Sequence, residues 1–203
     1  MRRLNTTACL PVVALLALAA CAASAPPVRL HSLMPVELAS REAGRPAIII
    51  TLEPIRVPAQ VDQPQWLVRL PDDSLAALEQ ERWVSPLSDE LRQALLEELG
   101  AGYGAIEGRG AAGALALRVG VEVRRFDTIP GREARIEAIW TVAVGGATPA
   151  LRCDALLREP AAAGMPALAA AHRRAVVRLA DAIGDSLVST RGPVPACPAL
   201  DPR

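Results

Sequence analysis

The sequence contains no lysine and very few aromatic residues. Phe, Trp and Tyr make up 2% of the 203 residues, while hydrophobic residues of all kinds make up 51%. The core must therefore be built mainly from aliphatic side chains. All 22 basic residues are arginine, and 22 acidic residues balance them to a formal net charge of zero. This balance excludes the basic footprint of a nucleic-acid-binding protein.

Motifs of catalysis and metal binding are also absent from the sequence. It has no G-x-S-x-G, H-E-x-x-H or phosphate-loop pattern, and no C-x-x-C pair or histidine cluster. Of its two histidines, His31 lies near the N-terminus, and His172 falls in an apolar helical stripe, where a core histidine is the simpler interpretation. We expect no enzymatic activity, no metal and no cofactor.

The N-terminal residues have the pattern of a secretory signal. Two arginines precede an apolar segment over residues 9–20, which is too short to cross a membrane comfortably. The segment ends in Leu18-Ala19-Ala20-Cys21, which is similar to the signal of bacterial lipoproteins. That resemblance implies cleavage after Ala20 and acylation of Cys21, and several acyl chains give stable anchoring. The alternative is a buried helix with an incidental cysteine.

The residues after the predicted cleavage point indicate where the protein is held. In lipoproteins of Gram-negative bacteria, Asp after the acylated cysteine favours the inner membrane. Ala22 stands at this position here. The resemblance therefore implies an outer-membrane location facing the periplasm. We divide the chain into a signal peptide (1–20), a lipidated N-terminus and tether (21–46), one domain (47–192) and an extended tail (193–203).

Cys153 and Cys197 are the cysteines that remain in the predicted domain and tail. In an oxidising periplasm they indicate a disulfide. Such a bridge would close a loop of about 44 residues and contribute on the order of 3–4 kcal/mol. Two unpaired thiols are the alternative, because spacing in sequence does not fix geometry.

Alternation of apolar and polar residues predicts most of the β-structure. Short apolar runs at 47–52 and 65–70 predict two strands. Residues 55–58 are expected to continue the first of them at the edge of the sheet. A clear period of two predicts an antiparallel meander over 115–124, 135–144 and 151–157. The Gly/Ala-rich residues 100–113 predict a flexible connector; a phosphate loop would have to follow a strand, and this stretch follows a helix.

Two amphipathic helices complete the expected fold. Ser85 is predicted as the N-cap and Pro86 as the first residue of a helix that Gly100 ends, and a second helix is expected over 164–189. The helices carry apolar stripes at Leu87, Leu91, Leu95 and Leu99, and at Met165, Leu168, His172, Val176, Leu179, Ile183 and Leu187. We expect an α/β (α+β) two-layer sandwich, with a mostly antiparallel sheet of about five strands and both helices on one face.

Four stretches resemble a known family in order and spacing. They are Glu53–Pro58, Asp62–Gln65, Arg82–Leu87 and Gly164–His172, and together they span nearly the whole mature chain. The sequence is similar here to the ABC-type transport auxiliary lipoproteins, which are subunits associated with membrane integrity. The resemblance implies an outer-membrane lipoprotein that docks an MCE-domain protein, which moves lipids between the two membranes. It also implies assembly as a homo-oligomeric ring.

The expected function is therefore that of a lipid-anchored adaptor. The alternative is a periplasmic lipid carrier, which predicts an apolar cavity between sheet and helices, lined by the stripe residues. Trp66 and Trp83 have two interpretations each: a ring packed in the core, or a contact to the partner protein.

Overall fold

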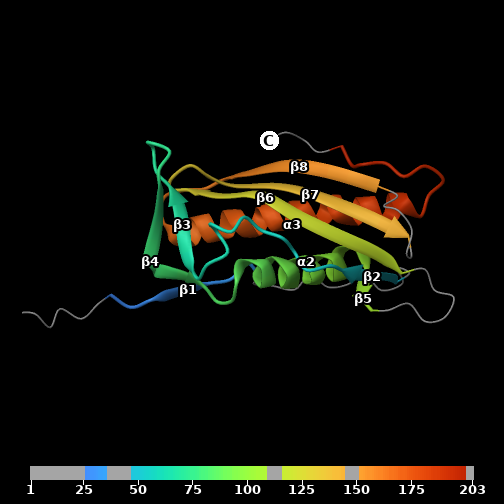
Figure 1. The fold of residues 1–203 in the computed structure, drawn as a ribbon, viewed down its shortest axis with the longest axis horizontal. Coiled ribbons are helices and arrows are strands. Elements are labelled where there is room, and N and C mark those ends of the chain that lie inside the picture. Colours follow the sequence, from blue (N-terminus) through green and yellow to red (C-terminus); the bar gives the residue numbers. More distant parts are fainter. Residues whose placement is uncertain (1–25, 36–46, 109–115, 145–150, 200–203) are drawn as a thin grey trace, which may run out of the picture.

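The computed structural model describes residues 26–35, 47–108, 116–144 and 151–199. Within them it has the predicted mixed α/β architecture of sheets and two helices (Figure 1). The elements in chain order are β1 (Arg29–His31), β2 (Ile48–Leu52), β3 (Gln65–Arg69), β4 (Leu75–Trp83), α2 (Leu87–Tyr103), β5 (Ala105–Glu107), β6 (Leu117–Ile129), β7 (Glu133–Val144), β8 (Leu151–Pro160) and α3 (Met165–Thr190).

A five-stranded sheet with the order β5-β2-β6-β7-β8 forms the body of the molecule. Strands β6, β7 and β8 pair antiparallel, which confirms the predicted meander. Between β6 and β7 the chain turns at Gly131, whose φ of 67° costs a glycine little. Strand β2 pairs parallel with both β5 and β6, so the sheet is antiparallel where its strands are long and parallel towards β5.

A second, three-stranded sheet with the order β1-β4-β3 crosses one end of the long strands (Figure 1). The expectation of a single sheet is wrong at this point, because the strand predicted at residues 65–70 belongs to the second sheet. Its hairpin partner β4 was not predicted. The sequence of β4 is rich in Ala, Leu, Glu and Gln, which favour helices, and its first six residues alternate between exposed and half-buried, so no apolar face marks it as a strand.

Both helices lie on one face of the five-stranded sheet, as predicted (Figure 1). Their stripes point inward: the four stripe leucines of α2 are completely buried, and so are most of those of α3. Each such side chain contributes roughly 2 kcal/mol relative to an exposed one. The core between sheet and helices is therefore mainly aliphatic, as the scarcity of aromatic residues predicted.

The ends of α2 differ from the prediction. Pro86 occupies the N-cap position, and the hydroxyl of Ser85 donates instead to the buried carboxylate of Glu90, at 2.8 Å. The helix passes through Gly100 to Tyr103 and ends at Gly104, which has a φ of 67°. Residues 105–107 then form β5, so the expected flexible connector is wrong over its first half.

The folded domain begins earlier than the sequence indicated. Arg29–His31 pair with β4 as a parallel strand, and Leu33 is buried. Glu90 accepts hydrogen bonds from the Leu33 amide and the Ser32 hydroxyl, at 2.8 and 2.7 Å. The tether predicted for 21–46 is therefore wrong over residues 29–33, where short-range patterns could not reveal pairing with a strand some fifty residues away.

Close contact between the helices makes Gly184 sensitive to substitution. A Cβ at this position would overlap the ring of Tyr103, whose hydroxyl is fixed near the Asp181 carbonyl and the Asp185 carboxylate, at 3.0 and 2.9 Å. We expect Gly184→Ala to lower the free energy of unfolding by about 1–3 kcal/mol. Chemical denaturation measures the change.

Gly102→Ala, on the neighbouring helix, is the matched control, because no atom lies within 4 Å of its added Cβ. It should leave stability unchanged or raise it by up to about 1 kcal/mol. In a Tyr103→Ala background the cost of Gly184→Ala should largely disappear. An equal cost with and without the Tyr103 ring would contradict the packing argument.

Candidate functional site

The predicted acylation site Cys21 lies outside the described residues, so its acylation stays a prediction. Residues 26–28, which lead into β1, emerge beside the three-stranded sheet (Figure 1). The Cys153–Cys197 bridge, left open by the sequence, is a disulfide in the structure, with the two Cα atoms 5.6 Å apart. Cys153 is buried on β8, and the chain folds back after α3 to reach it.

Removing this bridge should destabilise the domain. Cys197→Ser opens a closed loop with a separation of 44 residues, and the expected loss of unfolding free energy is roughly 3–4 kcal/mol. Guanidinium denaturation of the oxidised protein measures it. A thiol reductant should lower the stability of the wild type to that of the variant and leave the variant unchanged. A variant as stable as the oxidised wild type would show that the bridge adds nothing.

Trp66 and Trp83 lie in the core, with 1% and 5% of their surface exposed. Both indoles belong to a group of five rings where the two sheets meet, the aromatic junction: His31, Trp66, Trp83, Phe126 and His172. The ring centroids of the two indoles are 4.3 Å apart, and His172 stacks on Phe126 with 4.2 Å between the ring centroids. Both tryptophans thus follow the first of their two interpretations, a ring packed in the core. Trp83 also lines a small hollow beside Pro64 and Pro86, and a partner contact stays a prediction.

His172 is the polar member of the aromatic junction and is completely buried. Its Nε2 lies 2.8 Å from the hydroxyl of Thr128, and its Nδ1 has no hydrogen-bond partner among the described residues. Burial lowers the pKa of this imidazole to about 3. The ring is therefore neutral at ordinary pH and packs as part of the core.

This buried imidazole makes stability depend on pH. The pKa of His172 in the folded state, about 3, lies below its unfolded value of about 6.5. Protons then bind the unfolded chain first as the pH falls. Relative to His172→Leu, the wild type should lose about 1 kcal/mol of unfolding free energy per pH unit between pH 6 and 4. Urea denaturation at several pH values measures both proteins, and parallel curves would disprove the assignment.

A second polar contact holds β1 against β4. His31 Nε2 lies 2.6 Å from the buried carboxylate of Glu81, and Arg29 also pairs with Glu81. Burial alone would raise the pKa of Glu81, but the hydrogen bonds from His31 and Arg29 outweigh it and lower this pKa below its ordinary value. Glu81 therefore stays ionised, and the contact secures the strand nearest the predicted anchor.

An open cleft of about 520 Å³ lies between β3 and β6, and Phe126 of the aromatic junction is part of its lining. We call it the basic cleft. Strand β3 alternates here, with Trp66 and Val68 in the core and Leu67 and Arg69 facing the cleft. The charged residues of its lining are Arg69, Asp73, Arg124, Arg125, Asp127 and Arg135.

Asp127 forms ion pairs with three of the guanidinium groups that line the basic cleft. Its Oδ1 accepts a hydrogen bond from Arg69 at 2.9 Å, and its Oδ2 lies 3.9 Å from nitrogens of both Arg125 and Arg135. The side chain of Asp127 is 7% exposed, and its Oδ2 has no hydrogen bond among the described residues. One buried carboxylate thus holds three cations beside an open space, which is an arrangement suited to binding an anion.

A β-bulge places Arg124 beside Arg125 on the exposed side of β6. The pairing of β6 with β7 shifts between Val123 and Arg125, so Arg124 and Arg125 are both exposed before Phe126 returns to the core. Bulges commonly redirect side chains beside functional sites. The sequence contains a signal of this bulge, since two adjacent arginines interrupt the alternation of apolar and polar residues.

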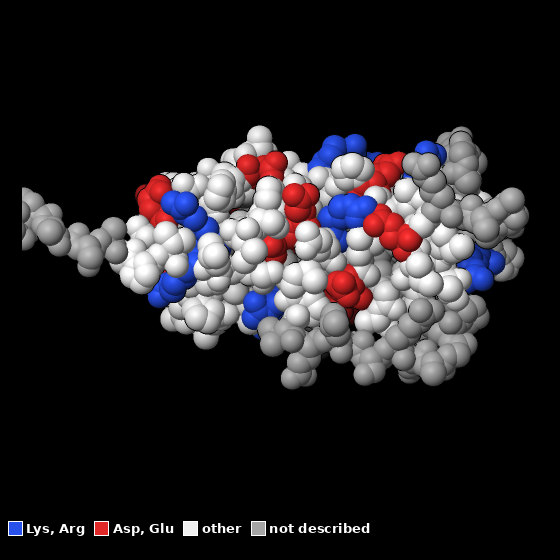
Figure 2. All heavy atoms as spheres, turned by 90° about the horizontal axis from the view of Figure 1, so that it is seen from below, with Lys and Arg blue, Asp and Glu red and all other residues white. Residues whose placement is uncertain are grey.

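Seen from below, the molecule carries acidic and basic side chains interspersed on its surface (Figure 2). Arg92 and Glu107, outside the basic cleft, also form an ion pair. Among the described residues no group of three or more His, Cys, Asp or Glu is placed to hold a metal ion.

The cavity expected of a lipid carrier would be lined by the helix stripes. An apolar hollow of about 500 Å³ does exist, but it lies at the far end of the sheet and is lined by Ile48, Ile49, Leu117 and Val144. The stripe leucines of α2 are completely buried and do not line it. The structure therefore gives no support to a carrier that encloses an acyl chain between sheet and helices.

Solved structures with little sequence identity share this fold. A crystal structure of an uncharacterized protein matches at a TM-score of 0.64 and 16% identity, over 79% of this chain and 98% of its own. A protein of the DUF330 family from Xanthomonas campestris matches at a TM-score of 0.62 and 16% identity, over 79% and 95% of the two chains. A comparison with curated proteins found no match.

The family itself is defined by sequence. The family model of the ABC-type transport auxiliary lipoprotein component matches residues 31–184, and the chain belongs to this family. This confirms the resemblance seen in the four sequence stretches. A lipoprotein family agrees with attachment to a membrane, and none of the described helices is long and apolar enough to span one.

Proposed function

We propose that the protein is a lipid-anchored adaptor subunit of an MCE-domain, ABC-type lipid transport system, held at the outer membrane and facing the periplasm. Its family membership over residues 31–184 is the observation that carries the proposal. In this proposal Cys21 carries the acyl chains, the domain docks the MCE protein and the complex supports envelope integrity. The chain itself does no catalysis, and copies assemble as a ring.

The position of the domain relative to Cys21 supports docking close to the membrane. Arg29, the first residue of β1, follows Cys21 by eight residues. An extended chain of that length spans at most about 28 Å. Because β1 is fixed to β4 and to Glu81, an anchor at Cys21 would hold the three-stranded sheet near the bilayer.

Capture of partners from the envelope tests the proposal. The tagged lipoprotein, purified from detergent-solubilised envelope, should bring down an MCE-domain protein and no stoichiometric phospholipid. Cys21→Ser, which cannot be acylated, is the control. It should appear in the soluble periplasmic fraction and still bind the MCE protein when mixed with solubilised envelope, because the anchor locates the domain and the folded surface binds the partner.

Two results would contradict this function. Phospholipid retained at one molecule per chain by the Cys21→Ser protein, with no protein partner, would make the domain a carrier. Capture of other transport components without any MCE-domain protein would keep the protein in its family and remove the proposed partner.

A further inference from the structure

The lining of the basic cleft has an excess of positive charge. The lining holds four arginines and the two carboxylates of Asp73 and Asp127. With the three glutamates at its border and with Arg132 and Arg158 nearby, six arginines meet five carboxylates. Three glutamates at the border form ion pairs, Glu122 with Arg124, Glu133 with Arg135 and Glu137 with Arg125. Each guanidinium carries five N–H donors, so these pairs leave donors free for a ligand.

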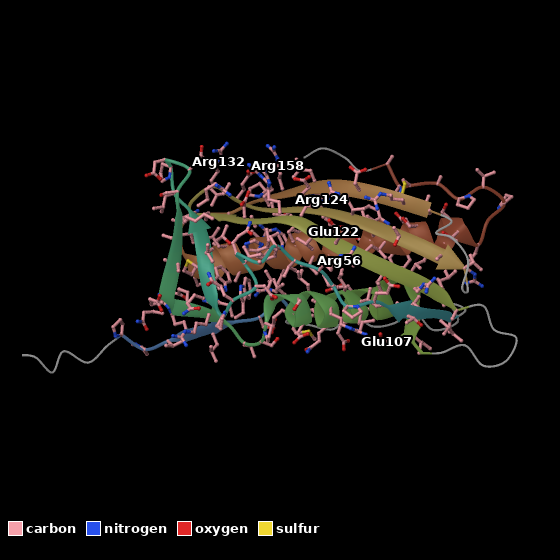
Figure 3. The ribbon with its side chains drawn as sticks, in the orientation of Figure 1. Arg56, Glu107, Glu122, Arg124, Arg132 and Arg158 are labelled. Atoms are coloured by element: carbon pink, nitrogen blue, oxygen red, sulfur yellow. A yellow bond between two sulfur atoms is a disulfide. The ribbon has the colours of Figure 1, made fainter. Side chains whose placement is uncertain are left out.

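The sheet beside the cleft continues this basic character. Arg158 on β8 lies directly opposite Arg135 on β7, so it adds a positive charge next to an arginine that is already paired with Asp127 and Glu133. Arg158 and Arg132 are exposed, and neither side chain has an ion-pair partner among the described residues. Figure 3 shows both towards the end of the molecule that carries the three-stranded sheet.

The walls of the cleft are fixed before any ligand arrives. Phe126 and Trp66, which belong to the aromatic junction, alternate with Arg125, Asp127 and Leu67 along β6 and β3. Because the junction rings are buried, the strands that carry the arginines cannot move apart freely. Because the backbones that carry the arginines are held in place, less conformational entropy is lost when a ligand binds.

We propose that the basic cleft binds a phosphate group carried on a small organic residue. Guanidinium groups match phosphate oxygens through paired N–H donors, and several of them at one place suit a group with multiple oxygens. The volume of about 520 Å³ exceeds the needs of a bare phosphate ion, and Val61, Leu67 and Leu75 add apolar surface for carbon atoms. Phospholipid headgroups and free phosphate esters share this chemistry.

The position of the cleft favours the headgroup as the source. Strand β3 forms one wall, and β3 belongs to the same three-stranded sheet as β1, which follows the predicted anchor (Figure 1). This step depends on the proposed anchoring at Cys21. The open cleft takes the headgroup and leaves the acyl chains outside, so binding is reversible and phospholipid is not retained through purification.

Calorimetric titration of the full-length lipoprotein in a maltoside detergent tests the site. The probes are monomeric dihexanoyl phosphatidylglycerol, glycerol 3-phosphate and inorganic phosphate, each at the same ionic strength. Arg124→Gln with Arg125→Gln should raise the dissociation constant of the lipid about tenfold or more. Both side chains are about half exposed, at 51% and 48%, so the substitutions should not unfold the domain.

Arg118→Gln is the matched control, because Arg118 lies on the same strand with 44% exposure and outside the cleft. It should change binding less than twofold. Tighter binding of the short lipid than of glycerol 3-phosphate supports a headgroup, and equal binding of the two supports a free phosphate ester.

Lack of binding by all three probes would overturn the proposal. A loss of lipid affinity in Arg118→Gln as large as in the double variant would also overturn it. So would inorganic phosphate that binds as tightly as both organic probes. These outcomes are independent of partner capture, because the MCE protein takes no part in the titration. The double variant should still capture the MCE protein if the adaptor function is correct and the cleft serves lipid alone.

Discussion

The contact between His172 and three aromatic rings joins every layer of this structure. His172 comes from α3, Phe126 from the five-stranded sheet, and Trp66 and Trp83 from the three-stranded sheet. Burying an imidazole is unfavourable unless it is hydrogen-bonded, and Thr128, two residues after Phe126, supplies the partner. Because one side chain touches both sheets, it fixes their relative position. The basic cleft, which opens on the other side of β3 and β6, depends on that position.

Buried carboxylates extend the same constraint to the N-terminal segment. Glu90 of α2 holds Ser32, Leu33 and Ser85 through its two oxygens, and Glu81 of β4 holds β1. A buried carboxylate is tolerated where such donors surround it, and its loss would leave them unpaired. The domain therefore includes the segment that approaches the predicted anchor. A force applied through an anchor at Cys21 would act on a strand that is part of a sheet.

Periodicity predicted the parts of the fold whose stability comes from one apolar face. The meander and both helices bury regular stripes, and their residues follow periods of two or of 3.6. Strand β4 escaped prediction because its sequence favours a helix and pairing alone makes it a strand. The cap at Ser85 was wrong because Pro86 takes the N-cap position and the Ser85 hydroxyl donates to Glu90 in the first turn of the same helix. The basic cleft could not be predicted, since Arg69 and Asp127 meet across 58 residues of sequence.

Because aromatic residues are scarce, only a few positions in the core can be filled by a large ring, and these positions are not spread evenly. Aliphatic side chains fill the regular space between sheet and helices, where spacing is uniform. The junction of two crossing sheets is irregular and wide, and large flat rings can span it. Three of the five aromatic residues accordingly lie there, while Tyr103 fills the gap left by Gly184 between the helices. Relatives with 16% identity keep the same fold. This is expected if most core positions require only an aliphatic residue, because such positions accept many substitutions of similar volume.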